Sequence, residues 1–362
     1  MSVASALPFR VGVMQLTMEP LDEMIGTARV LDEAGLDTIW LAEAYPWWRK
    51  HGMEARSSTV LSALMARDTE RLTIGWGIIS PYTRHPVQVA MDARIVQEAA
   101  GPDRFIVGFG TSKIFLNNTK QGGPPKETKP LGHMRDSVAI VRGALGGERF
   151  EYDGKVFSAD LPAIQAEAQA PDWQVPVYVA ATAPQMQQLG GEIGDGLLTP
   201  SITTPAFVRY TRENVAAGAA KAGRDGGEVD VGCTIVASIH ATDRDAGRDG
   251  AREIAGMYLA NKFQNIKASA DTLLDLAEIR MEELQPVAEA MERGGRLAAK
   301  AQVTDSLLDR CKPIAGTPAD CIAAIEEYRD AGCSHIMLEL WGADRHEQIR
   351  LFGERVVPHF KG

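Results

Sequence analysis

Cysteine is scarce in this 362-residue chain, and its placement excludes several classes of site. The four cysteines are Cys233, Cys311, Cys321 and Cys333, and no two of them form a CxxC pair. No Cys/His spacing resembles that of a zinc site, so we expect no metal centre. The pattern predicts free thiols in a reducing compartment.

Basic charge and long apolar runs are also lacking. The formal net charge is −10 at pH 7, which argues against binding to nucleic acid or to an anionic membrane surface. No segment reaches the roughly 18 uninterrupted apolar residues that a membrane helix needs. The N-terminal residues lack the basic start of a secretion signal. We therefore expect a soluble cytoplasmic protein whose ligands are small molecules.

Several common enzyme motifs are absent. The chain has no Walker A sequence, no HExxH and no GxSxG. The sequence GFGTSK at 108–113 lacks the third glycine of a dinucleotide fingerprint. The sequence DRDAGRDG at 243–250 has Ile254 where a calcium loop needs a glutamate. These absences argue against an ordinary Rossmann, P-loop, zinc-protease, serine-hydrolase or EF-hand site.

The chain does contain a regular alternation of short apolar runs and amphipathic segments. The apolar runs predict strands at 9–16, 37–44, 72–80, 104–112, 175–182, 195–200, 228–241 and 334–342. Near-continuous apolar strands that alternate with helices indicate a parallel sheet covered by helices. Their number and the chain length favour an α/β fold closed as a (β/α)8 TIM barrel. An open doubly wound sheet is the alternative.

The segments between these strands predict the rest of one barrel domain, residues 1–362. We expect helices at 20–35, 57–68, 86–100 and 134–145, and a hairpin turn at Asp153-Gly154. Residues 113–130 predict a long loop without regular structure. Residues 243–312 are too many for one barrel helix, so they predict an inserted helical segment before the eighth strand.

In a TIM barrel the active site forms at the C-terminal ends of the strands. Polar and aromatic residues follow four of the predicted strands, and we expect these to contact a cofactor: Gln15, Glu43, Trp48, Ser80, Thr111 and Ser112. Trp47 and Trp48 are adjacent, and their indole N–H groups need partners. A planar ring in the barrel mouth would use one of them.

Residues 180–198, AATAPQMQQLGGEIGDGLL, form a more specific pattern. A strand ends in small residues and Pro184 begins a helix, whose exposed backbone N–H groups favour a phosphate. A tight turn without a ligand would have the same pattern. We predict that a cofactor phosphate binds at Ala181, Thr182, Ala183 and Gln185.

Four segments resemble the bacterial luciferase-like superfamily, whose members are (β/α)8 barrels that bind FMN or the deazaflavin coenzyme F420. They are PYTRHPVQVA at 81–90, RFIVGFGTS at 104–112, residues 175–198, and GTPADCIAAIEEYRDAGCSHIMLEL at 316–340. The resemblance is closest to the F420-dependent branch, which includes methylene-tetrahydromethanopterin reductases. It implies F420 as the cofactor, with FMN as the alternative.

The resemblance also implies roles for residues near the ends of the second and third strands. In the family, the third strand ends in a bulge with a cis peptide bond that does not involve proline, and this bulge supports the cofactor ring. The matching residues are Gly77, Ile78 and Ile79. Ser80 matches a position that hydrogen-bonds the ring, and Glu43 keeps an acidic position that faces it.

Two positions depart from the sugar-phosphate dehydrogenases of this family. Ala44 and Lys113 stand where those enzymes have an acid-base histidine and a glutamate, which argues against glucose 6-phosphate as the substrate. We predict Glu43 and Lys113 as catalytic residues, with Lys113 attracting an anionic substrate or stabilising developing negative charge. A lysine that only reaches solvent is the alternative. We expect Arg84 and His85 to anchor the helix that follows them.

The function implied by the resemblance is that of a flavin- or deazaflavin-dependent oxidoreductase. We expect F420-dependent hydride transfer to or from a small organic substrate. An FMNH2-dependent monooxygenase that uses O2 and a separate flavin reductase is the alternative, and a non-catalytic flavin-binding barrel is a third. Family members are commonly dimers, so we expect a homodimer.

Overall fold

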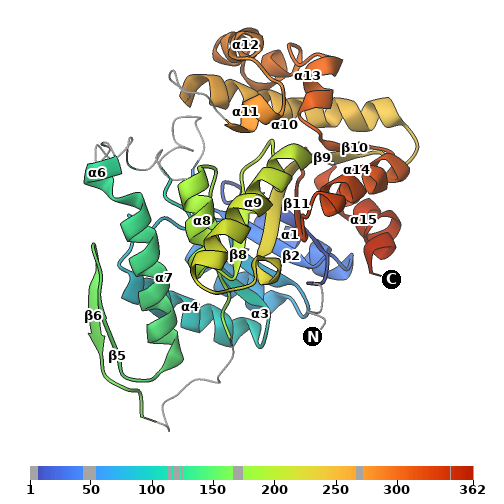
Figure 1. Ribbon diagram of the computed structural model, residues 1–362. Helices are drawn as coiled ribbons and strands as arrows, with labels where there is room; N and C mark the ends of the chain where they lie inside the picture. The colour runs from blue at the N-terminus through green and yellow to red at the C-terminus, as the bar shows by residue number, and fades with distance from the viewer. Residues whose placement is uncertain are drawn as a thin grey trace, which may run out of the picture.

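The centre of the molecule is a closed barrel of parallel strands (Figure 1). The computed structural model describes residues 7–43, 54–112, 116, 123, 125–165, 174–265, 272–342 and 344–361. In barrel order the strands are β9 (Asp230–Ile239), β11 (His335–Glu339), β1 (Arg10–Leu16), β2 (Thr38–Ala42), β3 (Thr73–Trp76), β4 (Phe105–Phe109), β7 (Val177–Ala180) and β8 (Gly196–Thr199). β8 pairs with β9 and closes the ring. The predicted barrel is confirmed, and the open sheet is wrong.

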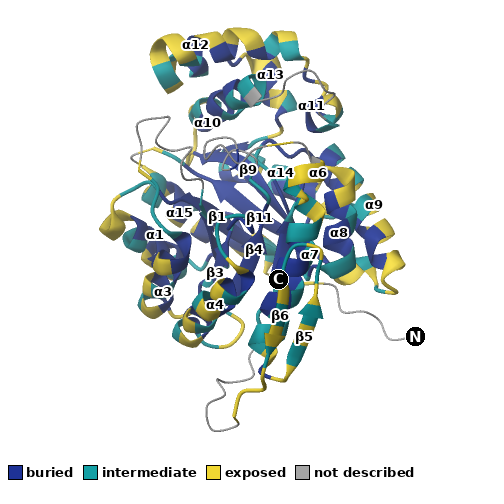
Figure 2. Ribbon diagram, turned by 90° about the vertical axis from the view of Figure 1, so that its left-hand side faces the viewer, coloured by how far each residue is buried: buried dark blue, intermediate teal, exposed yellow. Residues whose placement is uncertain are grey.

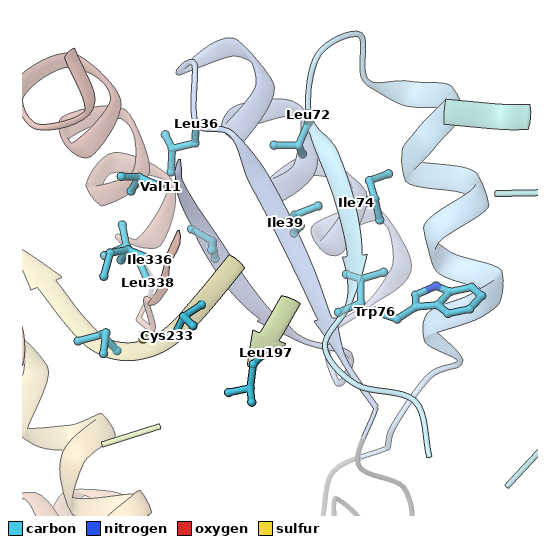
Figure 3. Packing of buried hydrophobic residues seen from close by; sticks show 14 of the residues in the cluster. Val11, Leu36, Ile39, Leu72, Ile74, Trp76, Leu197, Cys233, Ile336 and Leu338 are labelled. Atoms are coloured by element: carbon cyan, nitrogen blue, oxygen red, sulfur yellow. The ribbon is translucent and has the colours of Figure 1, made fainter. Parts of the chain in front are cut away.

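Helices surround this barrel, and their outer faces are exposed while the strands are buried (Figure 2). They are α1 (Leu21–Glu33), α3 (Ser58–Asp68), α4 (Pro86–Ala100), α7 (Pro130–Gly146), α8 (Pro184–Ile193), α9 (Pro205–Lys221), α14 (Pro318–Asp330) and α15 (Arg345–Arg355). Outward-facing strand residues such as Val11, Ile39 and Ile336 pack with helix residues in one large apolar cluster (Figure 3). Burial of this surface on both sides of the sheet explains why the strands read as apolar runs.

The predicted helical insertion is present between β9 and β11 (Figure 1). It contains α10 (Arg244–Asn265), α11 (Thr272–Leu276), α12 (Met281–Lys300) and α13 (Asp305–Arg310), which share an apolar cluster of their own. After it, β10 (Ile314–Gly316) pairs with the end of β9. This strand was not predicted, because three residues are too few to show a pattern.

Two further elements lie outside the barrel, and one corrects the sequence prediction. The hairpin predicted at Asp153-Gly154 is confirmed as β5 (Phe150–Asp153) and β6 (Ser158–Leu161). The prediction that residues 113–130 form no regular element is wrong, because α6 (Pro125–Thr128) lies within them. α7 also begins at Pro130, earlier than expected, since proline is well tolerated in a first helical turn. Short 3-10 turns are η2 (Gly226–Glu228) and η3 (Val357–Phe360).

A buried polar network fills the N-terminal end of the barrel. The Asp230 carboxylate accepts hydrogen bonds from Arg10, from Ser334 and from the Tyr178 hydroxyl. Nδ1 of His335 lies 3.5 Å from Asp230 Oδ2, while its Nε2 accepts from Trp40 Nε1 at 3.2 Å. Because these polar side chains fill the N-terminal end of the barrel, a ligand site can form only at the opposite end, where the strands terminate.

Candidate active site

The floor of the barrel mouth is made of apolar residues at the ends of the strands. Ala42, Ile78 and Ala180 are half-buried and pack on the barrel-interior cluster of Met14, Trp40, Ile106, Tyr178, Leu198 and Met337. Gly77 belongs to the same layer, because a Cβ atom there would lie 3.1 Å from Met14 Cε. At Gly110 a Cβ atom would lie 2.7 Å from Ile78 Cγ1. These apolar residues at successive strand ends form a surface above the packed interior.

The end of the third strand has the geometry predicted from the sequence. The peptide bond between Gly77 and Ile78 is cis, which confirms the expected bulge. Ile79 then rejoins the fourth strand, since its N–H donates to Gly108 O at 2.9 Å and its carbonyl accepts from Gly110 N at 3.0 Å. The Ser80 side chain is buried, and its Oγ accepts from Tyr82 N at 3.3 Å.

Glu43 lies at the end of the second strand but faces away from the barrel axis. It follows the alternation of Ile39 and Leu41, which pack with the outer helices. Its carboxylate pairs with Arg84 at 2.7 Å, and Oε2 also accepts from Ser58 N at 3.1 Å. Glu43 therefore links three segments around the mouth, and its predicted contact with a cofactor stays a prediction.

The turn before α4 is held by its own side chains. His85 is the N-cap of α4, and its Nδ1 accepts from Val87 N at 3.3 Å. Arg84 bonds to the Thr83 hydroxyl at 3.2 Å in addition to Glu43. The expectation that Arg84 and His85 anchor the start of this helix is confirmed.

The residues just before α8 and at the start of its first turn are exposed. Thr182, Ala183 and Gln185 are exposed, and Ala183 is an N-cap without a side-chain hydrogen bond. Ala181 differs from them, because it is buried and its N–H donates to Leu198 O at 3.0 Å within the sheet. The predicted phosphate position therefore has donors at three of its four residues.

A cavity of about 360 Å³ opens between the ends of β1 and β11. Its lining includes Met14 and Leu16 from β1, Trp341 just after β11, Arg345 from α15, and Arg296 from α12. The Arg296 guanidinium lies 5.3 Å from the Trp341 ring centroid. Met14 belongs both to this lining and to the interior cluster on which the mouth floor packs.

Gln15 is a buried polar residue among those that line this cavity. The side chain is 2% exposed and lines the cavity. Its Nε2 donates to Leu16 O at 2.8 Å and to Glu19 Oε2 at 3.0 Å, whereas Oε1 has no hydrogen-bond partner among the described residues. A buried acceptor without a partner is costly unless a ligand or water satisfies it.

Comparison with known proteins identifies the family of this barrel. The profile of the family described as "Luciferase-like monooxygenase" matches residues 1–335. The chain belongs to this family. It is similar to a 5,10-methylenetetrahydromethanopterin reductase from Methanolobus tindarius, 29% identical over 96% of this chain and 99% of the relative. It is also similar to an F420-dependent glucose-6-phosphate dehydrogenase from Rhodococcus erythropolis, 25% identical over 94% of each.

Solved structures support the same luciferase-like fold. The coenzyme F420-dependent tetrahydromethanopterin reductase from Methanopyrus kandleri superposes with a TM-score of 0.82 at 24% identity, covering 98% of this chain and 99% of that one. An F420-dependent secondary alcohol dehydrogenase superposes with a TM-score of 0.74 at 18% identity, covering 97% and 99%. The resemblance inferred from the sequence is confirmed, and the chain is an oxidoreductase of this family.

Two predicted site residues, Trp48 and Lys113, lie outside the described residues, so their roles stay predictions. Thr111 and Ser112 follow β4 and are half-buried at the mouth. No cluster of three or more His, Cys, Asp or Glu side chains in the described part of the chain could hold a metal ion.

The sequence placed Glu339 at the end of the predicted eighth strand, but no role was predicted for this carboxyl. Glu339 is the last residue of β11 and is 0% exposed. Ser201 Oγ donates to it at 2.9 Å, and the Tyr258 hydroxyl forms a second, short hydrogen bond. Burial raises the pKa of Glu339 to about 7. The sequence does contain a signal for this carboxyl, because Glu339 is an ionisable residue inside the apolar run HIMLEL. Side chains alternate along a strand, so Glu339 points to the same side as His335 and Met337, toward the barrel interior.

Proposed function

We propose that this protein is an F420-dependent oxidoreductase that transfers hydride between the deazaflavin and a small organic substrate. The observation that carries the proposal is the mouth floor of Ala42, Gly77, Ile78 and Ala180, which are half-buried at the strand ends and would support the face of a planar ring. The names of the F420-dependent glucose-6-phosphate dehydrogenase and of the coenzyme F420-dependent reductase support F420 over FMN.

The residues present fit such a cofactor at two places. The floor at Gly77 and Ile78 would carry the ring, and the exposed N–H groups of Thr182, Ala183 and Gln185 would hold a phosphate. F420 supplies the hydride chemistry when bound. The chain contributes binding, orientation and exclusion of water around the reacting ring.

The substrate would occupy the cavity beside the floor. Met14 belongs to both places, which brings a ligand in the cavity next to a ring on the floor. Gln15 Oε1 offers an acceptor that would orient a substrate donor group. Trp341 offers an apolar face, and Lys113 remains a proposed cation near the same mouth.

The test is anaerobic titration with F420 and with FMN, each oxidised and reduced, followed by ring absorbance and tryptophan fluorescence. We expect a Kd for F420 at least tenfold lower than that for FMN. Tighter binding of FMNH2, together with oxygen consumption in a separate aerobic assay with reduced FMN, would replace the proposal with the monooxygenase alternative and its separate reductase. Absence of binding by either cofactor would overturn the proposal.

A pair of matched variants ties binding to the floor. Gly110→Ala places a Cβ atom against Ile78 and should weaken F420 binding at least tenfold. Gly26→Ala lies in α1, where no atom comes within 4 Å of the added Cβ, and should leave binding unchanged. Equal Kd values for both variants would show that the ring lies elsewhere.

We also propose a cytoplasmic homodimer. Four exposed apolar residues on the neighbouring helices α3 and α4 support the dimer: Val60, Leu64, Met91 and Ile95. All four cysteines are free thiols, which supports a reducing compartment. Among the described helices, none combines the length and apolar character of a membrane span.

A further inference from the structure

Glu339 connects the barrel with the helical insertion. One of its hydrogen-bond partners, Ser201, follows β8 of the barrel, and the other, Tyr258, belongs to α10 of the insertion. Both Glu339 and its two bonds are enclosed, since the carboxyl group has no exposed surface. The end of β11 is thus fixed to an element more than 80 positions away in the chain.

A second contact between the same two parts lies two residues further along. Trp341 packs on the apolar cluster of the insertion, and Arg296 of α12 lies over its ring. α12 in turn rests on α10, where the Gly256 position approaches the backbone of Ala299. The Glu339–Tyr258 bond and the Trp341–Arg296 contact therefore hold the insertion, and with it Arg296 of the cavity lining, against the barrel.

We infer that Glu339 is a positioning residue for the substrate cavity: through Tyr258 it holds the inserted helices across the barrel mouth and so places Arg296. This inference rests on the proposed function for the role of the cavity. The docking of α10 by Glu339, however, does not depend on which cofactor binds.

The charge state of Glu339 makes this docking dependent on pH. Only Ser201 and Tyr258 act on the carboxyl from the elements packed against it, and no cation of the described residues neutralises it. Both hydroxyls donate to the carboxyl and so favour its ionised form, but burial outweighs them and favours the neutral acid while the inserted helices are docked. Ionisation above pH 7 would bury a negative charge without a counter-ion, which is unfavourable. We therefore expect the inserted helices to loosen as pH rises through 7.

Hydrogen exchange of the full-length protein tests the docking without any ligand. After correction for the chemical exchange rate, protection of peptides from α10 should fall at least tenfold between pH 6 and pH 8, while α4 peptides stay unchanged. Glu339→Gln removes the titration, so its α10 protection should be the same at both pH values. Glu282→Gln, an exposed glutamate of α12, should behave as wild type. Equal wild-type α10 protection at pH 6 and pH 8 would overturn the inference.

Tyr258→Phe provides a second route if Glu339→Gln does not fold. It removes the bond to α10 and should lower α10 protection at both pH values; wild-type protection in this variant would also overturn the inference. Once a substrate is known, KM should rise between pH 6 and pH 8 in wild type and stay flat in Glu339→Gln, with an unchanged Kd for F420. A pH-dependent α10 in a protein that binds no F420 would refute the proposed function and leave the docking intact.

Discussion

Glu43 and Arg84 form a two-pronged ion pair at the barrel mouth, with Nη1–Oε1 and Nη2–Oε2 distances of 2.7 and 3.0 Å. Their side chains are 14% and 19% exposed. The same carboxylate accepts from Ser58 N, the first residue of α3. One residue therefore fixes the end of β2, the start of α3 and the turn before α4.

Replacing Glu43 should cost stability. Glu43→Gln leaves Arg84 without its counter-charge in a largely buried place, so we expect the free energy of unfolding to fall by about 1–3 kcal/mol, less than for a fully buried pair. Urea unfolding at pH 7 measures this change. Glu98→Gln, at an exposed position of α4, is the matched control and should lie within about 0.5 kcal/mol of wild type.

Glu43→Gln and Arg84→Gln together test whether Glu43 also contacts the cofactor. If it does, Glu43→Gln should weaken F420 binding several-fold more than Arg84→Gln, although both break the ion pair. Equal Kd values for the two variants would assign Glu43 to the support of the mouth alone.

The polar network at the other end of the barrel should make stability sensitive to acid. Burial alone would raise the pKa of Asp230, but bonding to His335 and the charge of Arg10 hold the pKa well below its usual value. In the unfolded chain the pKa of this carboxyl is near 4, and in the folded protein it is lower. The ionised carboxylate therefore stabilises the fold above pH 4, and this stabilisation is lost as the pH falls below 4. Asp230→Asn should lower the free energy of unfolding at pH 7 by about 3 kcal/mol.

Urea unfolding of this variant between pH 2.5 and pH 7 checks the sign. Wild type should lose stability steeply below pH 4, and Asp230→Asn should lose less, because it has no carboxylate to protonate there. Asp22→Asn, at an exposed position of α1, should follow the wild-type curve. Parallel curves for wild type and Asp230→Asn would show that the network does not act through this carboxylate.

The barrel could be predicted because its strands are buried on both sides, which makes each an uninterrupted apolar run. The positions of Ser80 and Thr182 at strand ends followed from the same pattern. Contacts between distant segments could not be predicted in this way. Tyr258 belongs to no motif, so nothing in the sequence pairs it with Glu339. The outward direction of Glu43 was readable from its alternation with Ile39 and Leu41, but the strong resemblance to a ring-facing position favoured the other interpretation.

The start of α8 offers a direct test of the proposed phosphate position. Thr182→Asp adds a negative charge beside the exposed N–H groups and should weaken F420 binding at least tenfold, because like charges repel. Thr182→Asn has nearly the same shape without the charge and should lie within about threefold of wild type. Titration at two ionic strengths checks the cause, since salt should reduce the effect of Asp. Unchanged affinity in Thr182→Asp would place the phosphate elsewhere.

The apolar patch on α3 and α4 predicts the assembly of the protein. Val60 and Leu64 lie one helical turn apart, as do Met91 and Ile95, and Val60, Met91 and Ile95 are at least 60% exposed. Such paired stripes suit an interface in which the same patch meets itself across a two-fold axis.

Light scattering should give twice the monomer mass of 39.2 kDa for wild type. Ile95→Lys should shift the mass to that of the monomer, because two lysines would be buried at the interface. Leu297→Lys alters an equally exposed leucine on α12 and should remain dimeric. A wild-type mass of 39.2 kDa, or a dimer that survives Ile95→Lys, would contradict this assignment of the interface.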